Sequence, residues 1–292
     1  MPAASALAAS APADPVVIRS LGELVDRVTP DEPNPTTGRR RDAGVYRGVG
    51  EARWPMLTSL DRLGGTRPPH TKAGLEEHVL RNFARYSRPH VAAAGPAHND
   101  WELLAAAQHH GVPTRLLDWT YSPLVAAHFA TMGRRGVAGQ GGTQGGGEPG
   151  TDRVIWRLDW QRVHRHFGLP ERALLAEDLE RLRDPAGGGR FTPWRLVESG
   201  GRVEPFACLF EPPTLDARIA AQAAVFTLAS STSQSFDAFL AAHGLADALT
   251  PYVIPAAEVG RVRDQLDLVS FDERRLFPDL DGVAAQLRRY YS

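Results

Sequence analysis

The chain has almost no cysteine and no long apolar run. Cys208 is the only cysteine among 292 residues, which excludes a disulfide framework and a cysteine-based metal cluster. Because Cys208 stands in an apolar run, we expect a small buried side chain there. No stretch approaches 18 apolar residues, so the sequence predicts no membrane-spanning helix and no membrane partner. The first residues lack a basic region followed by an apolar core, so they do not resemble a signal peptide. We therefore expect a cytoplasmic protein.

Lysine is also nearly missing. Lys72 is the only lysine, the other basic residues are arginines, and the net charge is −1. A balanced charge excludes a strong global attraction to nucleic acid or to anionic membranes. A codon bias explains the arginine content, so an arginine is informative only through its place in the chain.

Two segments of biased composition mark the organisation of the chain. Residues 1–15 are rich in Ala, Ser and Pro and predict a disordered tail. Residues 133–150 are rich in glycine and predict a flexible insertion, with a second glycine-rich turn at 187–189. No internal repeat is visible. Residues 16–292 are therefore expected to form one domain that carries this insertion.

Helical and strand patterns alternate along the chain. Apolar spacing of three and four residues predicts helices at 16–28, 75–86, 100–110, 123–132, 172–183 and 282–291. Short runs of β-branched and aromatic residues predict strands at 44–49, 154–158, 207–210, 224–228 and 252–254, with an extended segment at 113–119. Ser122 followed by Pro123 is typical of a helix start, because proline at the first helical position loses no hydrogen bond.

The segment from Gln108 to Thr120 is dense in polar side chains between two capped helices. A helix end, an extended turn and a new helix start so close together predict a concave place where backbone N–H groups point outward. A plainer interpretation is that Arg115 pairs with Asp118, and that the histidines at 109–110 cap a helix end. A metal site at 109–110 is disfavoured, because adjacent histidines face different ways on a helix and no third ligand is near.

Tyr46-Arg47-Gly48 is followed by four further segments of distinctive pattern, at 54–60, 108–130, 218–226 and 276–282. Together these segments resemble the FRG domain family, which is named after a (Phe/Tyr)-Arg-Gly motif near its start. The resemblance extends over residues 40 to 290. It implies an FRG-type domain but no settled activity.

A second, more distant resemblance is to ADP-ribosyltransferase-like domains. These domains bind NAD through an arginine on a first strand, followed by a Ser/Thr-bearing strand that leads into a helix with an Ala-x-x-Phe-Ala pattern. Arg47, residues 114–120 and residues 126–130 correspond to these parts. Gln222 stands where such domains carry a glutamate on a later strand. The resemblance implies an α+β fold with split, mostly antiparallel small sheets flanked by helices, and NAD as substrate without a metal.

This resemblance implies roles for particular residues. Arg47 would grip a phosphate or ribose by a forked contact that lysine cannot copy. Gln222 can hydrogen-bond a ribose hydroxyl but is neutral, so Asp118 is the preferred carboxylate, with Glu211 in reserve. Trp119 or Tyr46 would stack on the nicotinamide. The expected catalytic residues are thus Asp118, Gln222 and Arg47, and the expected NAD-binding residues are Tyr46, Arg47, Gly48, Gln108, Thr114, Arg115, Trp119 and Thr120.

Three functions stay open at this point. The first is an NAD-using ADP-ribosyltransferase, with a protein or nucleic-acid acceptor, or an NAD-cleaving enzyme. The second is a module that binds a nucleotide or a peptide without catalysis. The third is a structural role in which Arg47 and Asp118 form a buried pair, and this alternative predicts no cavity. Residues 230–233 resemble a Ser-Thr-Ser motif but follow Gln222, and we expect a polar loop there.

Overall fold

The computed structural model describes residues 13–90, 99–132, 148–181, 205–213 and 217–291. Most of the expected tail, most of the expected glycine-rich insertion and the expected turn at 187–189 lie outside these residues. The strands are β1 (Val16–Val17), β2 (Val45–Val49), β3 (Leu117–Thr120), β4 (Arg153–Leu158), β5 (Ala207–Phe210), β6 (Ala224–Ala229) and β7 (Leu249–Ile254). The α-helices are α1 (Leu21–Val28), α2 (Ser59–Arg62), α3 (Lys72–Ser87), α4 (Asp100–His109), α5 (Pro123–Thr131), α6 (Trp160–His166), α7 (Ala176–Arg181), α8 (Ala217–Gln222), α9 (Phe236–Ala242), α10 (Val259–Leu268), α11 (Glu273–Leu276) and α12 (Leu280–Tyr290).

The described strands form one open seven-stranded sheet in the order β1-β7-β4-β2-β3-β6-β5. All neighbouring strands are antiparallel except β1 and β7, which are parallel. The expectation of mixed helices and mostly antiparallel strands is therefore confirmed. The expected separation into small sheets is wrong, because β2 and β3 join the two parts into one.

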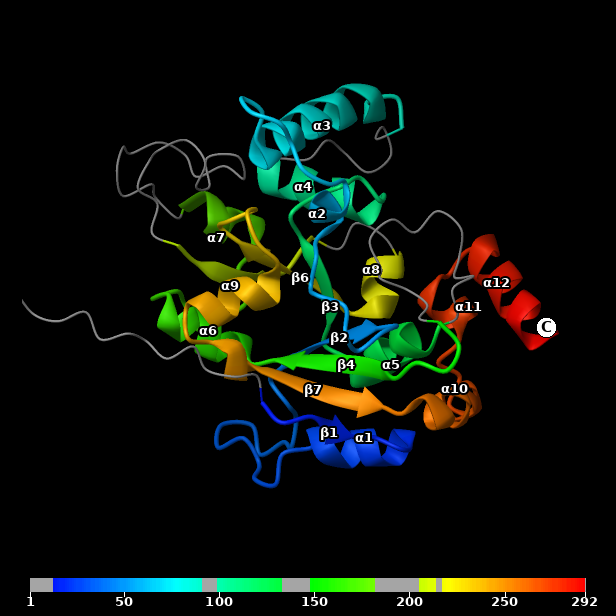
Figure 1. The fold of residues 1–292 in the computed structure, drawn as a ribbon. Coiled ribbons are helices and arrows are strands. Elements are labelled where there is room, and N and C mark those ends of the chain that lie inside the picture. The colour runs from blue at the N-terminus through cyan, green and yellow to red at the C-terminus, as the bar shows by residue number, and fades with distance from the viewer. Residues whose placement is uncertain (1–12, 91–98, 133–147, 182–204, 214–216, 292) are drawn as a thin grey trace, which may run out of the picture.

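That junction is narrow. β2 pairs with β4 along its whole length, and β3 does the same with β6, but β2 and β3 share a single register pair, Tyr46 with Thr120. Figure 1 shows β3 and β6 running at a steep angle to β4 and β7. Beyond this pair, β2 and β3 are not paired with each other. The candidate site lies at this unpaired part of the β2–β3 junction.

Helices cover both faces of the sheet. On one face α1, α5 and α10 enclose an apolar cluster that includes Tyr46, Ile155 and Tyr252 from the strands. On the other face α6 and α9 pack on a cluster that includes Val45 and Trp119. Tyr46 and Val45 are adjacent on β2 and point to opposite clusters, as strand alternation requires. Near the β5 edge, α3, α4 and α7 enclose a third cluster, which contains the buried Cys208.

The helix starts follow the capping signals in the sequence. The side chains of Ser20, Asn99 and Ser122 each accept a backbone N–H of the first turn of their helix, and Pro123 stands at the start of α5. The first helix begins at Leu21, not at Val16, because Val16 and Val17 pair with β7 as a strand. The helix expected at 172–183 is described only as α7. The short α2, α6 and α8–α11 were not anticipated.

Among the described residues, no helix combines the length and the hydropathy needed to cross a membrane.

Candidate functional site

Gly48 brings α5 against β2. A Cβ atom at this position would lie 1.9 Å from the backbone oxygen of Ala126 and 2.6 Å from the backbone nitrogen of Ala130. Any side chain would therefore push the helix away from the strand. The glycine of the Tyr46-Arg47-Gly48 motif thus serves packing: the helix backbone occupies the place that a side chain or a ligand group would take.

Arg47 lies in the open junction between β2 and β3. Strand alternation would direct Arg47 and Asp118 to opposite faces of a closed sheet. Because the sheet is open here, Arg47 Nη1 donates to the backbone oxygen of Asp118 at 2.6 Å and lies 3.9 Å from Asp118 Oδ2. The side chain is 4% exposed, and its Nε is buried without a hydrogen-bond partner. Arg47 is therefore a buried cation with an unused donor.

The pKa of Arg47 reflects this burial. Loss of solvent lowers it to about 10, although the nearby Asp118 carboxylate raises it and Arg62 lowers it further. The guanidinium still carries its charge at neutral pH. A buried charge that is only partly compensated favours an anionic ligand.

A chain of hydrogen bonds fixes the carboxylate of Asp118. The Thr114 hydroxyl accepts the N–H of Leu116 at 3.1 Å and donates to Gln108 Oε1 at 2.6 Å. Gln108 must then present its amide nitrogen to Asp118, and it contacts both carboxylate oxygens at 3.0 Å. The Asp118 side chain nevertheless remains 35% exposed. Its carboxylate is held in place and stays open to a ligand.

Arg47, Asp118 and Gln222 line one pocket with a cavity volume of about 70 Å³. A cavity needs roughly 10–15 Å³ on this scale to hold one water, so the pocket has room for a small ring or a phosphate group. Val125, Ile219 and Phe129 are apolar residues of the lining. Among the described residues, the lining consists of Tyr46, Arg47, Gly48, Gln108, His109, Asp118, Trp119, Thr120, Val125, Ala126, Phe129, Arg218, Ile219, Gln222, Ala224 and Phe226.

Arginine side chains stand in and beside the lining of the pocket. Arg218 lines it together with Arg47, and its guanidinium lies 5.1 Å from the ring centroid of Phe277. Arg62 interacts electrostatically with Arg47, and also with the carboxylates of Asp118 and Asp61. Among the described residues, Asp118 is the only carboxylate in the lining. The buried Arg47 guanidinium, which Asp118 compensates only in part, would attract an anionic group such as a phosphate.

Gln222 ends α8 and does not stand on a strand as expected. Residues 217–222 contain mostly good helix formers, and the chain enters β6 only after Ala223, whose φ of 44° breaks the helix. The Gln222 side chain donates to the backbone oxygen of Leu276 at 3.0 Å, and its own backbone oxygen accepts the Thr120 hydroxyl at 2.7 Å. The pocket wall at Gln222 therefore depends on α11.

Two of the expected binding residues do not line the pocket. Thr114 acts through Gln108, as described above. Arg115 is buried, and its Nε donates to Glu76 at 2.5 Å, so the alternative in which it pairs with Asp118 is wrong. The reserve carboxylate, Glu211, is also absent from the lining.

The two expected ring clamps are buried in the core. The Trp119 indole donates to the Thr227 hydroxyl at 2.8 Å and packs edge-on against Phe236. Tyr46 is 1% exposed, and its hydroxyl donates to Asp42, so burial and this carboxylate raise the pKa of the tyrosine. Both residues are in the lining of the pocket, but their side chains are almost fully buried and already contact other parts of the core. Phe129 also lines the pocket, is partly exposed, and was not among the expected ring clamps.

Arg218 and Ile219 were also not singled out as site residues. A signal for Arg218 was present, because residues four apart on a helix share one face and Arg218 precedes Gln222 by four. Residues 230–233 form the expected polar loop, with Ser230 accepting the N–H of Phe206 at 3.0 Å. In the described part of the chain, no group of three or more His, Cys, Asp or Glu side chains is placed to hold a metal.

The fold and the pocket define an α/β protein with a polar site, which contains a buried arginine, at an open strand junction. Residues 42–137 match the family model of the FRG domain. This range is shorter than the 40–290 expected from the resemblance. It contains Arg47, Gln108 and Asp118 but not the lining residues from Arg218 onward. No curated protein and no solved structure matches the chain, and no comparison supports the resemblance to ADP-ribosyltransferases.

Proposed function

We propose that the pocket binds NAD and that the protein cleaves its nicotinamide–ribose bond, as a glycohydrolase or as an ADP-ribosyltransferase. The observation that carries the proposal is the position of Arg47, a buried arginine with an unused Nε next to a fixed, solvent-reachable carboxylate. A phosphorylated ribonucleoside would satisfy both groups at once.

The pocket accepts one part of the dinucleotide. A cavity of about 70 Å³ suits the nicotinamide ring, which would lie against Phe129 and Ile219. The diphosphate would lie at the mouth, where Arg47 and Arg218 supply positive charge. Forked guanidinium contacts to phosphate are stronger and more directional than an ammonium contact.

Asp118 would act on the developing charge of the ribose. The bond between the ribose carbon and the nicotinamide nitrogen breaks, and its electron pair leaves with the nicotinamide. Positive charge then develops on the sugar, and a fixed carboxylate stabilises it. Water or another nucleophile adds to the ribose carbon and loses its proton to solvent. A protein or nucleic-acid acceptor would make the reaction a transfer. We place this activity in the cytoplasm.

A second candidate is a nucleotide-binding module without catalysis. One observation favours it: both oxygens of Asp118, the only carboxylate among the described lining residues, already accept hydrogen bonds from Gln108. Gln222, the other polar group expected to act on the ribose, is neutral and bonded to Leu276. A peptide ligand would meet the same cationic pocket through a carboxylate. A purely structural role for Arg47 and Asp118 predicted no cavity, and a cavity is present.

The test is calorimetric titration with NAD beside a nicotinamide-release assay. Arg47→Lys keeps the charge but loses the fork, so we expect binding to weaken by about tenfold or more. Asp118→Asn is nearly isosteric, so binding should persist while turnover falls by about 100-fold or more, as for an interaction made in the transition state. Matched controls are Arg165→Lys on the exposed surface and Glu211→Gln outside the pocket lining.

Each outcome separates the candidates. NAD binding without nicotinamide release by the wild type identifies the non-catalytic module. Equal release by wild type and Asp118→Asn removes Asp118 from the chemistry. Absence of NAD binding by a folded wild type rejects the proposal, and melting curves of every variant exclude unfolding as the cause.

A further inference from the structure

The helix α12 turns its apolar side away from the protein. Leu280, Val283, Leu287 and Tyr290 follow the heptad spacing that forms one helix face, and all four are exposed. Leu280 is 85% and Tyr290 is 69% exposed. The side that faces the protein carries Gly282, which is the only buried residue of the helix. An amphipathic helix of a lone globular domain normally has the opposite orientation.

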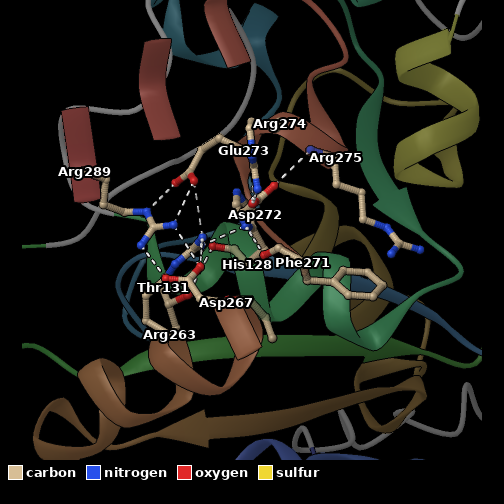
Figure 2. A network of polar contacts seen from close by, with 11 residues as sticks. His128, Thr131, Arg263, Asp267, Phe271, Asp272, Glu273, Arg274, Arg275 and Arg289 are labelled. Atoms are coloured by element: carbon tan, nitrogen blue, oxygen red, sulfur yellow. Dashed lines mark hydrogen bonds and ion pairs between the residues drawn. The ribbon is translucent and has the colours of Figure 1, made fainter. Parts of the chain in front are cut away.

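Specific contacts hold α12 in this orientation. A Cβ atom at Gly282 would lie 1.9 Å from the backbone oxygen of Phe277, so the helix approaches the preceding turn as closely as its backbone allows. Figure 2 shows Arg289 reaching from α12 to two carboxylates. It donates to Asp267 of α10 at 2.7 and 2.8 Å, and to Glu273 of α11 at 2.8 and 3.0 Å.

Further apolar residues are exposed at the end of α10 and just after α12. Leu268 is 83% exposed, and Val269 and Tyr291 are also exposed. Because Arg289 binds Asp267, the end of α10 lies beside the end of α12, and Figure 1 shows both at the edge of the molecule. We call Leu268, Val269 and the four-residue face of α12 the α12 patch. Patches above a few hundred Å² are rare on monomers and typically mark interaction sites.

We propose that the α12 patch binds a second copy of this chain through an antiparallel, two-fold α12–α12 contact. A two-fold axis near residue 285 pairs Leu280 with Tyr290 of the other copy, and Val283 with Leu287 of the other copy. Every apolar residue of the face therefore meets an apolar residue of different size, and the face is complementary to itself.

The charges on α12 favour this arrangement over others. Asp281 and Arg288 are both exposed, near opposite ends of the helix. Antiparallel pairing brings Asp281 of each copy near Arg288 of the other, whereas parallel pairing would oppose like charges. Ala284 and Gln286 lie closest to the axis, where each copy meets nearly its own sequence, and neither carries a charge that would repel.

The experiment is to measure the mass of the full chain by light scattering and by sedimentation at micromolar concentrations. We expect a dimer of twice 31.8 kDa. Leu280→Gln with Leu287→Gln should weaken dimerisation by about tenfold or more, because the two changes place a polar side chain in each of the apolar pairs of the contact. The matched control is Tyr86→Gln on α3, which removes an exposed apolar side chain outside the α12 patch and should leave the dimer intact.

A charge exchange tests the direction of the pairing. Asp281→Arg or Arg288→Asp alone should weaken the dimer by about two- to fivefold, and the two changes together should restore it. A monomeric wild type at these concentrations overturns the proposal. Binding of that monomer to vesicles of phosphatidylcholine and phosphatidylserine would instead assign the α12 patch to a lipid surface. A dimer that survives the leucine substitutions in folded protein also overturns it.

Discussion

Neighbouring residues of one tripeptide have different physical roles here. Gly48 allows the close approach of α5 to β2, whereas Arg47 places a buried charge in the open junction of the sheet. Tyr46 anchors the strand from the other side by donating its hydroxyl to Asp42, which also accepts Arg157 of β4 at 2.7 Å. The motif therefore combines one candidate ligand group with two packing residues. This division predicts different consequences for their substitution.

Gly48→Ala should destabilise the protein without adding or removing a polar group. The new Cβ has no space beside Ala126, so we expect a loss of at least roughly 1–3 kcal/mol in the free energy of unfolding. A urea titration measures this loss. Gly65→Ala is the control, because a Cβ there meets nothing within 4 Å. Equal stability of the two variants would contradict the packing role of Gly48.

At the scale of elements, α5 joins the pocket to the C-terminal helices. Val125, Ala126 and Phe129 line the pocket. His128 is fully buried, and its Nδ1 lies 2.8 Å from Arg263 Nη1 on α10. Figure 2 shows this histidine within the network that continues through Arg263 and Glu273 to Arg289. Side chains of one helix thus contact both the candidate site and the network that anchors α12.

The same histidine predicts a loss of stability in acid. Burial first, and the charge of Arg263 second, lower the pKa of His128 to about 3, against about 6.5 in an unfolded chain. Between these values the unfolded state binds a proton that the folded state excludes. The contribution of neutral His128 to the free energy of unfolding is therefore complete above pH ~6.5. It declines as the pH falls below this value, by up to about 1.4 kcal/mol per pH unit.

Urea titrations between about pH 7.5 and 5 measure this slope. His128→Gln retains a hydrogen-bond acceptor for Arg263 but cannot be protonated, so the stability of this variant should depend less on pH. Part of the pH dependence of stability should remain in this variant, because burial also lowers the pKa of His164. The exposed His166→Gln is the control. An unchanged slope in His128→Gln would show that other groups cause the acid sensitivity.

At the scale of the whole molecule, the pocket depends on parts of the chain that lie far apart. The FRG match at 42–137 includes β2 and β3 but not their main partners, β4 and β6. Within the match these two strands share only the pair of Tyr46 with Thr120. The wall formed by Arg218 and Gln222, and its support from Leu276, also lie outside it.

A fragment of residues 40–137 should therefore fail to fold alone. The fragment has two strands joined by one residue pair, and its α5 lacks the contacts to β4 and α10. It therefore buries too little apolar area to offset the conformational entropy that the chain loses on folding. We expect no cooperative thermal transition by circular dichroism, with the full chain as reference. A cooperative transition in the fragment would show that the FRG segment is an independent unit.

Much of the local structure was predictable from the sequence, because its causes lie within a few residues. The caps at Ser20, Asn99 and Ser122 act on the next turn of their own helix. The apolar neighbours of Cys208 indicated a buried side chain. The polar segment Gln108–Thr120 does contribute to the pocket, because it joins the end of α4 to β3 and the start of α5.

The partners of the polar side chains were decided by the tertiary structure. Arg115 has Asp118 nearby in sequence, but both its backbone N–H and its guanidinium donate to Glu76 of α3, a residue 39 positions away. Only the folded sheet brings Arg47 and Asp118 together, and only the packing of α8 against α11 fixes Gln222. The sequence by itself determined where α4 and α5 begin and that the run around Cys208 is buried. The open junction and the outward face of α12 arise from contacts between residues far apart in the chain, which no local pattern records.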